Sequence, residues 1–157
     1  MSSVGARCWA KCLSAPVARD SAMPVLTTAQ SERDAVANAF ADQARLIVVS
    51  LCADWCDTCK EFRDAFETIA NARPSIAFVW LDIEDDSAVA GDIDVENFPT
   101  LAIYRGDTVL HFGVSLPHEG TVARLVDEMA ERTTAVSNAP EEVRELPQLL
   151  KDRSQAA

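Results

Sequence analysis

The chain has 157 residues, 48% of them hydrophobic, which suits one domain with a sizeable core. Its formal net charge of −11 at pH 7 argues against nucleic acid and anionic membrane surfaces as partners. No apolar run approaches the roughly 18 residues that span a bilayer, and the first 23 residues lack the apolar core of a secretory signal.

Hydrophobic periodicity predicts strands and helices that alternate along most of the chain. The run Leu46–Cys52 is apolar on both faces, which is typical of a central strand covered by helices on both sides. The expected elements are, in order, a short edge strand at 23–28, a helix at 32–43, a strand at 46–52, a helix at 56–71, a strand at 76–82, a short helix at 87–92, a strand at 100–105, its hairpin partner at 109–113, and a last helix that opens at 117–120.

Both ends of the chain are expected to lie outside the domain, which we place at 24–132. Residues 1–23 contain basic and small residues and only one acid. We expect a disordered extension or a start codon assigned too early, and an organelle transit peptide is the alternative. Residues 133–157 are expected to form a polar tail, in which Pro147 interrupts any helical turn.

Two of the five cysteines, Cys56 and Cys59, stand one helical turn apart where the central strand feeds a helix. A helix N-terminus carries about half a positive charge, which stabilises a thiolate. The second thiol is then close enough to attack a mixed disulfide formed by the first. This Cys-x-x-Cys motif predicts thiol–disulfide exchange, and a single such pair among an odd number of cysteines favours a reducing compartment, which we take to be the cytoplasm.

Other roles for the cysteines are weaker. A structural metal needs further ligands, and neither a second Cys-x-x-Cys nor a His pair is present. Cys52 completes an iron–sulfur spacing with Cys56 and Cys59, but we expect it to point into the core as a small hydrophobic residue, with secondary oxidation as the alternative. Cys8 and Cys12 are expected to be incidental. We expect no metal and no cofactor, since the chain has no Gly-rich nucleotide fingerprint.

Together these features resemble the thioredoxin superfamily. The resemblance rests on the order of elements, on Trp55-Cys56-Asp57-Thr58-Cys59-Lys60 at a strand–helix junction, on Phe98-Pro99-Thr100 before the hairpin, and on Gly113 at its end. The segment from Cys52 to Phe62 is also similar to the C-terminal domain of thiol:disulfide interchange proteins. The resemblance implies an α/β thioredoxin-like fold with a central mixed sheet of four to five strands flanked by helices.

The resemblance also implies roles for particular residues. Cys56 is then the exposed nucleophile and Cys59 the more buried resolving thiol of a protein-disulfide reductase. The implied substrate groove consists of Trp55, Phe98, Pro99 and Gly113, with Pro99 in the cis form and facing the cysteines. The implied partners are disulfide-containing proteins and a separate reductase that donates electrons, and we expect a monomer.

Two departures from the thioredoxin pattern affect the chemistry. Ser50 stands where thioredoxins carry a buried acid, and Trp80 stands where a lysine often accompanies it. Because the acid and the lysine are both absent, neither charge is buried without its partner. Between the cysteines, Asp57-Thr58 replaces the usual Gly-Pro.

Three charged residues are expected to tune the Cys56 thiolate. Asp54 and Asp57 disfavour it through their negative charge, whereas Lys60 and the helix dipole favour it. A less stabilised thiolate makes the reduced form a better electron donor.

Two other functions stay open at this point. One is a thioredoxin-like binding or scaffolding module with little turnover, which the serine at position 50 favours slightly. The other is a dedicated electron donor to a single partner.

Overall fold

The computed structural model describes residues 25–53, 55–90, 93, 95–136 and 138–156. The expectations for residues 1–23 and for Asp54 therefore fall outside the described residues. The elements are β1 (Val25–Thr27), η2 (Gln30–Glu32), α2 (Arg33–Ala41), β2 (Leu46–Cys52), α3 (Asp57–Asn71), β3 (Ala77–Asp82), α4 (Ser87–Ala90), β4 (Thr100–Arg105), β5 (Thr108–Val114), α5 (Glu119–Glu131) and α6 (Glu141–Ala156). Among these, no helix is long and apolar enough to cross a membrane.

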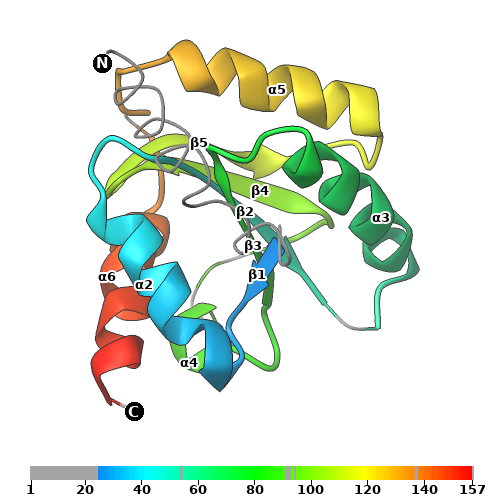
Figure 1. The fold of residues 1–157 in the computed structure, drawn as a ribbon. Helices are drawn as coiled ribbons and strands as arrows, with labels where there is room; N and C mark the ends of the chain where they lie inside the picture. Colours follow the sequence, from blue (N-terminus) through cyan, green and yellow to red (C-terminus); the bar gives the residue numbers. More distant parts are fainter. Residues whose placement is uncertain (1–24, 54, 91–92, 94, 137, 157) are drawn as a thin grey trace, which may run out of the picture.

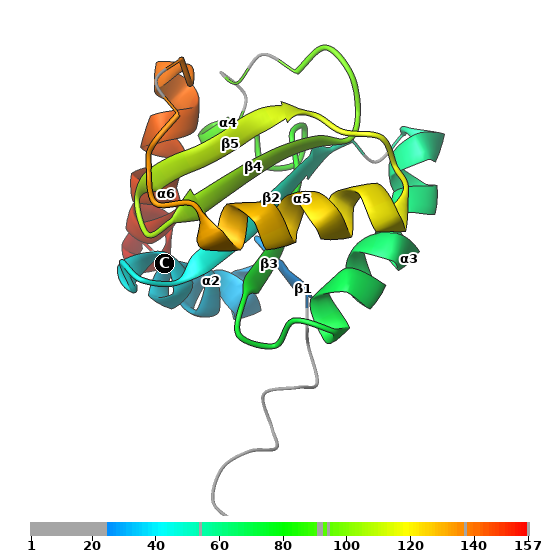
Figure 2. The same ribbon diagram turned by 90° about the horizontal axis from the view of Figure 1, so that it is seen from above.

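The five strands form one mixed sheet in the order β1-β3-β2-β4-β5, which confirms the predicted fold class. β2 lies at the centre, parallel to β3 and antiparallel to β4. β4 and β5 form a hairpin, and Gly106 takes a positive φ of 61° in its turn. That backbone conformation favours glycine because it has no Cβ. Helices α3 and α5 cover one face of the sheet, while α2 and α6 cover the other (Figures 1 and 2).

Successive residues of β2 point to opposite faces of the sheet, and each face has its own core. Ile47, Val49 and Leu51 pack in the cluster that includes α2 and α6. Leu46 and Val48 pack in the cluster that includes α3 and α5. The same alternation directs Ser50 and Cys52 toward the α3 face, and their side chains lie 3.6 Å apart (Oγ to Sγ). The end of the central strand therefore carries a cysteine toward the start of α3.

The C-terminal segment is not the polar tail that we expected. Helix α6 packs against α2, and Val143, Leu146 and Leu150 are buried in the core of that face. The three residues recur at spacings of three and four, so they form one apolar stripe on an otherwise polar helix. The domain therefore continues beyond residue 132.

Pro147 lies inside α6 rather than interrupting it. A proline has no N–H, so in a helix the carbonyl four residues earlier loses its usual donor. Here that carbonyl belongs to Val143, and the hydroxyl of Tyr104 donates a hydrogen bond to it at 2.8 Å. A side chain from β4 thus replaces the missing helical donor and ties α6 to the sheet.

Tyr104 is fully buried, and burial raises the pKa of its hydroxyl well above the ordinary value. In the unfolded chain it ionises near pH ~10. The folded state holds this proton where the unfolded state has lost it, so the free energy of unfolding is unaffected below about pH 10 and falls as the pH rises above it. Because this is the single tyrosine of the chain, we expect tyrosinate absorbance to appear only together with loss of the circular dichroism of the helices.

The matched variant is Tyr104→Phe, which removes the titrating group and leaves the Val143 carbonyl without its donor. We expect this variant to have a free energy of unfolding about 1–3 kcal/mol lower at neutral pH, which is the usual cost of an unsatisfied buried polar group. Urea unfolding measures that loss. Tyrosinate absorbance that rises near pH ~10 while the wild-type chain stays folded would contradict the assignment.

Candidate active site

The sequence places the cysteines where a buried strand gives way to a helix. β2 ends at Cys52 and α3 begins at Asp57, with Cys56 as its N-cap residue. Cys56 has extended backbone angles, its thiol is free and its side chain is partly exposed. Cys59 lies in the first turn of α3, only 1% exposed. The helix N-terminus therefore presents one accessible thiol and directs the other inward.

Cys59 is disulfide-bonded to Cys52, with the Cα atoms 5.9 Å apart, well within the range usual for a disulfide. The expectation that Cys52 is only a small hydrophobic residue is therefore wrong. The bond also differs from the Cys56–Cys59 pairing that the resemblance implies. Cys52 is directed to the α3 face by the alternation of β2, and Cys59 faces the core from the first helical turn. The alternation of side chains along β2, which can be read from the sequence, is the signal that places Cys52 on the same face as Cys59.

Trp55 joins the cysteine segment to the proline loop. Trp55 is 62% exposed, and its ring meets the ring of Phe98 edge to face, with the centroids 5.6 Å apart. The following Phe98–Pro99 peptide bond is cis. The Pro99 carbonyl accepts a hydrogen bond from the Ser115 backbone N–H at 3.0 Å, which fixes the loop to the end of β5. Segments far apart in sequence thus lie beside one another next to Cys56.

Exposed apolar side chains occur at the same end of the sheet. Val114, the last residue of β5, is 57% exposed, and Leu116, just beyond it, is 61% exposed. Gly113 pairs with Leu101 in the β4–β5 ladder. A Cβ built on Gly113 would reach only the His111 ring, at an ordinary 3.8 Å. The packing of the chain itself therefore does not require glycine at this position.

Behind the cysteines, Ser50 and Trp80 lie opposite one another on β2 and β3. Ser50 is fully buried, and the Arg63 guanidinium carbon stands 5.0 Å from the centroid of the Trp80 ring. A cavity of about 240 Å³ adjoins this point, and its lining includes Cys59, Lys60 and Trp80. A hydroxyl and an indole thus occupy the positions of the acid and lysine of the thioredoxin pattern. The cavity therefore adjoins the Cys59 side of the disulfide.

The residues expected to tune the thiolate are placed only in part. Asp57 opens α3 and Lys60 lies one turn further on, and both are exposed. The Lys60 backbone N–H donates to the Cys56 carbonyl at 3.2 Å. Both charges therefore lie on the exposed surface of the first turn, on either side of the buried Cys59.

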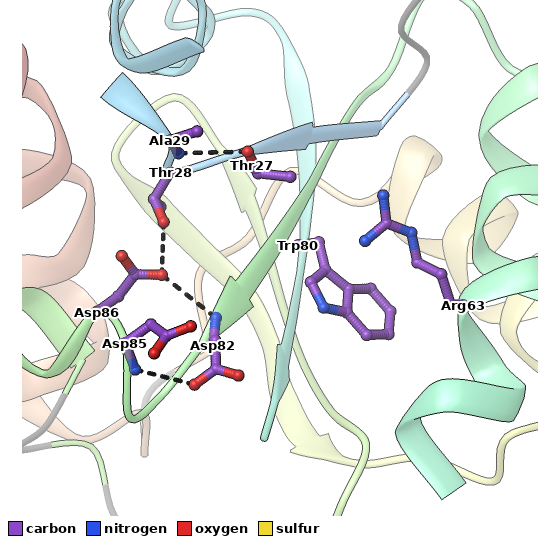
Figure 3. Close-up of a pocket in the computed structure, with 8 residues that line it drawn as sticks. All are labelled: Thr27, Thr28, Ala29, Arg63, Trp80, Asp82, Asp85 and Asp86. Carbon is purple, nitrogen blue, oxygen red and sulfur yellow. Dashed lines mark hydrogen bonds between the residues drawn. The ribbon is translucent and has the colours of Figure 1, made fainter. Parts of the chain in front are cut away.

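A larger pocket of about 410 Å³ also reaches Arg63 and Trp80, and no cysteine lines it (Figure 3). The acids on its rim take part in hydrogen bonds that shape the turn after β3. Asp86 accepts from the Thr28 hydroxyl and, at 3.3 Å, from the Asp82 backbone N–H. The Asp82 carboxylate accepts from the backbone N–H of Asp85 at 3.0 Å. In the part of the chain that the structure describes, no group of three or more His, Cys, Asp or Glu is arranged to hold a metal ion.

The five-stranded mixed sheet, the cysteine at the start of α3 and the cis-proline loop define the class of thioredoxin-like α/β proteins. A family model described as Thioredoxin matches residues 25–131. The chain therefore belongs to the thioredoxin family, and helix α6 lies outside the matched segment.

Among curated proteins, the thioredoxin of Ophiophagus hannah is 32% identical over 68 residues, which is 43% of this chain and 65% of that protein. Thioredoxin-2 of Saccharomyces cerevisiae is 36% identical over 69 residues, or 44% and 66% of the two chains. The matched segments thus span slightly less than two thirds of these relatives.

Solved thioredoxins share the fold. A mutant thioredoxin of Halobacterium salinarum superposes with a TM-score of 0.57 at 23% identity, over 76% of this chain and all of that one. The oxidised thioredoxin of Plasmodium falciparum superposes with a TM-score of 0.54 at 22% identity, over 68% of this chain and 98% of that one. A structure of thioredoxin f2 in complex with ferredoxin:thioredoxin reductase gives a TM-score of 0.55 at 15% identity, over 66% of this chain and 93% of the matched one.

Proposed function

We propose that this protein is a thiol–disulfide oxidoreductase that reduces protein disulfides, with Cys56 as nucleophile and Cys59 as resolving thiol. One observation carries the proposal. A free, partly exposed thiol caps the N-terminus of α3 beside Trp55, whose ring contacts the loop that bears the cis Pro99. Family membership supports the same chemistry.

The reaction begins from the form in which all three cysteines near the site are thiols. The Cys56 thiolate attacks one sulfur of a substrate disulfide, forms a mixed disulfide and releases the other substrate sulfur as a thiolate, which takes up a proton. Cys59 then loses its proton and attacks the Cys56 sulfur, which releases the second substrate thiol. Two electrons pass to the substrate, and a Cys56–Cys59 disulfide remains.

The proton of Cys59 has no buried carboxylate at position 50 to accept it. Ser50 is not a base at neutral pH, so water in the cavity of about 240 Å³ beside Cys59 takes that proton. Lys60 and Arg63 also line this cavity.

Regeneration needs a separate dithiol reductase, because a two-electron donor must reopen the disulfide. The solved thioredoxin f2 noted above is in complex with ferredoxin:thioredoxin reductase. We place this protein in the cytoplasm on the strength of its cysteine usage, and we expect it to be a monomer. Its substrates are proteins whose disulfide lies in an extended, partly apolar segment.

The apolar surface formed by Trp55, Val114 and Leu116 is the proposed substrate contact. We expect Trp55→Ala to raise KM for a protein disulfide several-fold, since a contact residue at an interface costs about 1–2 kcal/mol on truncation. We expect little change in kcat, because the two sulfurs keep their places on α3. Steady-state reduction of insulin gives both constants.

The control for Trp55→Ala is Leu149→Ala, which removes a partly exposed apolar side chain from α6 on the opposite face of the sheet. It should leave KM unchanged. A Trp55→Ala protein with wild-type KM would argue against this surface as the substrate contact.

Reduction of insulin driven by dithiothreitol tests the proposed function itself. We expect the wild-type chain to accelerate precipitation of the insulin B chain well above the rate with dithiothreitol alone. A rate equal to that of the no-protein control would instead indicate a binding module with little turnover.

A further inference from the structure

Cys52 belongs to the exchange chemistry as a third reacting cysteine. We propose that Cys59 exchanges between Cys56 and Cys52, so that the oxidised protein stores its disulfide as Cys52–Cys59 and keeps Cys56 as a free thiol. The proposal rests on the bond that the structure shows, together with the free, partly exposed Cys56 three residues before Cys59.

The placement of the three sulfurs supports this exchange. Cys52 ends β2 and points to the face that α3 covers, while Cys59 points inward from the first turn of that helix. Both are only 1% exposed. A bulky oxidant therefore cannot reach Cys52 directly, and oxidation reaches it through Cys56 and then Cys59.

The exchange balances without any external redox partner. Starting from a Cys56–Cys59 disulfide, the Cys52 thiol loses its proton and attacks the Cys59 sulfur. The Cys52–Cys59 bond forms, the Cys56–Cys59 bond breaks, and Cys56 leaves as a thiolate that takes up a proton. One disulfide and one thiol are present before and after the step. Ser50 Oγ lies 3.6 Å from Cys52 Sγ, within hydrogen-bond reach of that sulfur.

This arrangement has a consequence that rests on the proposed function. A thioredoxin-type protein with two cysteines has no free thiol in its site once oxidised. Here Cys56 remains available, so the oxidised protein can still attack a disulfide. The resulting mixed disulfide is not resolved while Cys59 is bonded to Cys52. The oxidised protein would therefore capture a disulfide without releasing it.

Disulfide mapping tests the exchange. The experiment uses the full chain with Cys8→Ser and Cys12→Ser, which removes the other two cysteines. The protein is oxidised with diamide, and free thiols are blocked with N-ethylmaleimide in acid, where thiolates are too scarce for exchange. A protease that cuts before aspartate then separates the three cysteines, because Asp54 and Asp57 stand between them.

We expect a Cys52–Cys59 link and maleimide on Cys56 in the oxidised chain. The matched variant Cys52→Ala should show a Cys56–Cys59 link and no maleimide in this region. An oxidised chain in which Cys56 is fully protected from maleimide and Cys52 carries the label would overturn the proposal.

A second variant and a second probe separate this inference from the proposed function. With diamide, Cys56→Ser should form the Cys52–Cys59 link far more slowly than the parent chain, because the buried pair then lacks the route through Cys56. Formation of that link at the parent rate overturns the proposal. Oxidised glutathione, offered to the oxidised proteins, should add one glutathione to Cys56 of the parent chain and none to Cys52→Ala. Neither measurement requires reduction of a protein. A chain that does not reduce insulin can therefore still give both expected results, and a chain that reduces insulin can still give neither.

Discussion

Replacing Cys56 by serine is expected to abolish insulin reduction, lowering the rate to that of dithiothreitol alone. Serine keeps the size of the side chain but provides no thiolate, and the thiolate is the attacking species. Cys59 cannot substitute for it, because its side chain is buried against the end of β2. Turbidity of the insulin B chain measures the effect.

Two comparisons make the Cys56→Ser result specific. The double variant Cys8→Ser/Cys12→Ser removes the same chemical group from two positions far from the Cys-x-x-Cys motif in sequence, and we expect it to retain wild-type activity. Circular dichroism should be unchanged in Cys56→Ser, since the residue caps α3 without a side-chain hydrogen bond. Substantial activity in a folded Cys56→Ser protein would remove Cys56 from the role of nucleophile.

Leu146→Ala is expected to destabilise the fold by about 2–5 kcal/mol, as large-to-small changes in a packed core usually do. Leu146 is fully buried in the cluster that joins α6, α2 and β2. A loss of this size is a large fraction of the roughly 5–15 kcal/mol that holds a typical domain together. Urea unfolding followed by circular dichroism measures the free energy of unfolding.

The same helix supplies the control for Leu146→Ala. Leu149 lies three residues further on and is 37% exposed. Its truncation should change stability by no more than ~0.5 kcal/mol, as is usual for surface positions. Equal effects of the two substitutions would mean that α6 does not pack on α2 in solution.

Most of the fold follows from local patterns in the sequence. The central strand at 46–52 could be predicted to the residue, because a short run that is apolar on both faces is typical of a strand buried between two layers of helices. The helical spacing of Phe62, Phe66 and Ile69 predicts the next helix, and the expected start at 56 differs by one residue from the observed start at Asp57. The hairpin was equally clear from Gly106 between two apolar runs.

Long-range contacts account for what could not be predicted. Pro147 indicated a break in any C-terminal helix, and only the hydroxyl of Tyr104, from a distant strand, satisfies the carbonyl that the proline leaves without a donor. The partner of Cys59 also depends on a long-range contact. Spacing along the chain indicates Cys56 as the partner, whereas the end of β2 points its Cys52 side chain toward α3 and so brings it to Cys59.

The position of α6 also bears on how the protein can be handled. Helix α6 covers the face of the sheet opposite the one covered by α3, where the cysteines lie. An affinity tag or a surface attachment joined after α6 would therefore leave Cys56 and Trp55 turned toward incoming proteins. Such an immobilised chain, prepared as Cys59→Ser so that mixed disulfides persist, would retain its natural substrates from a cell extract for identification.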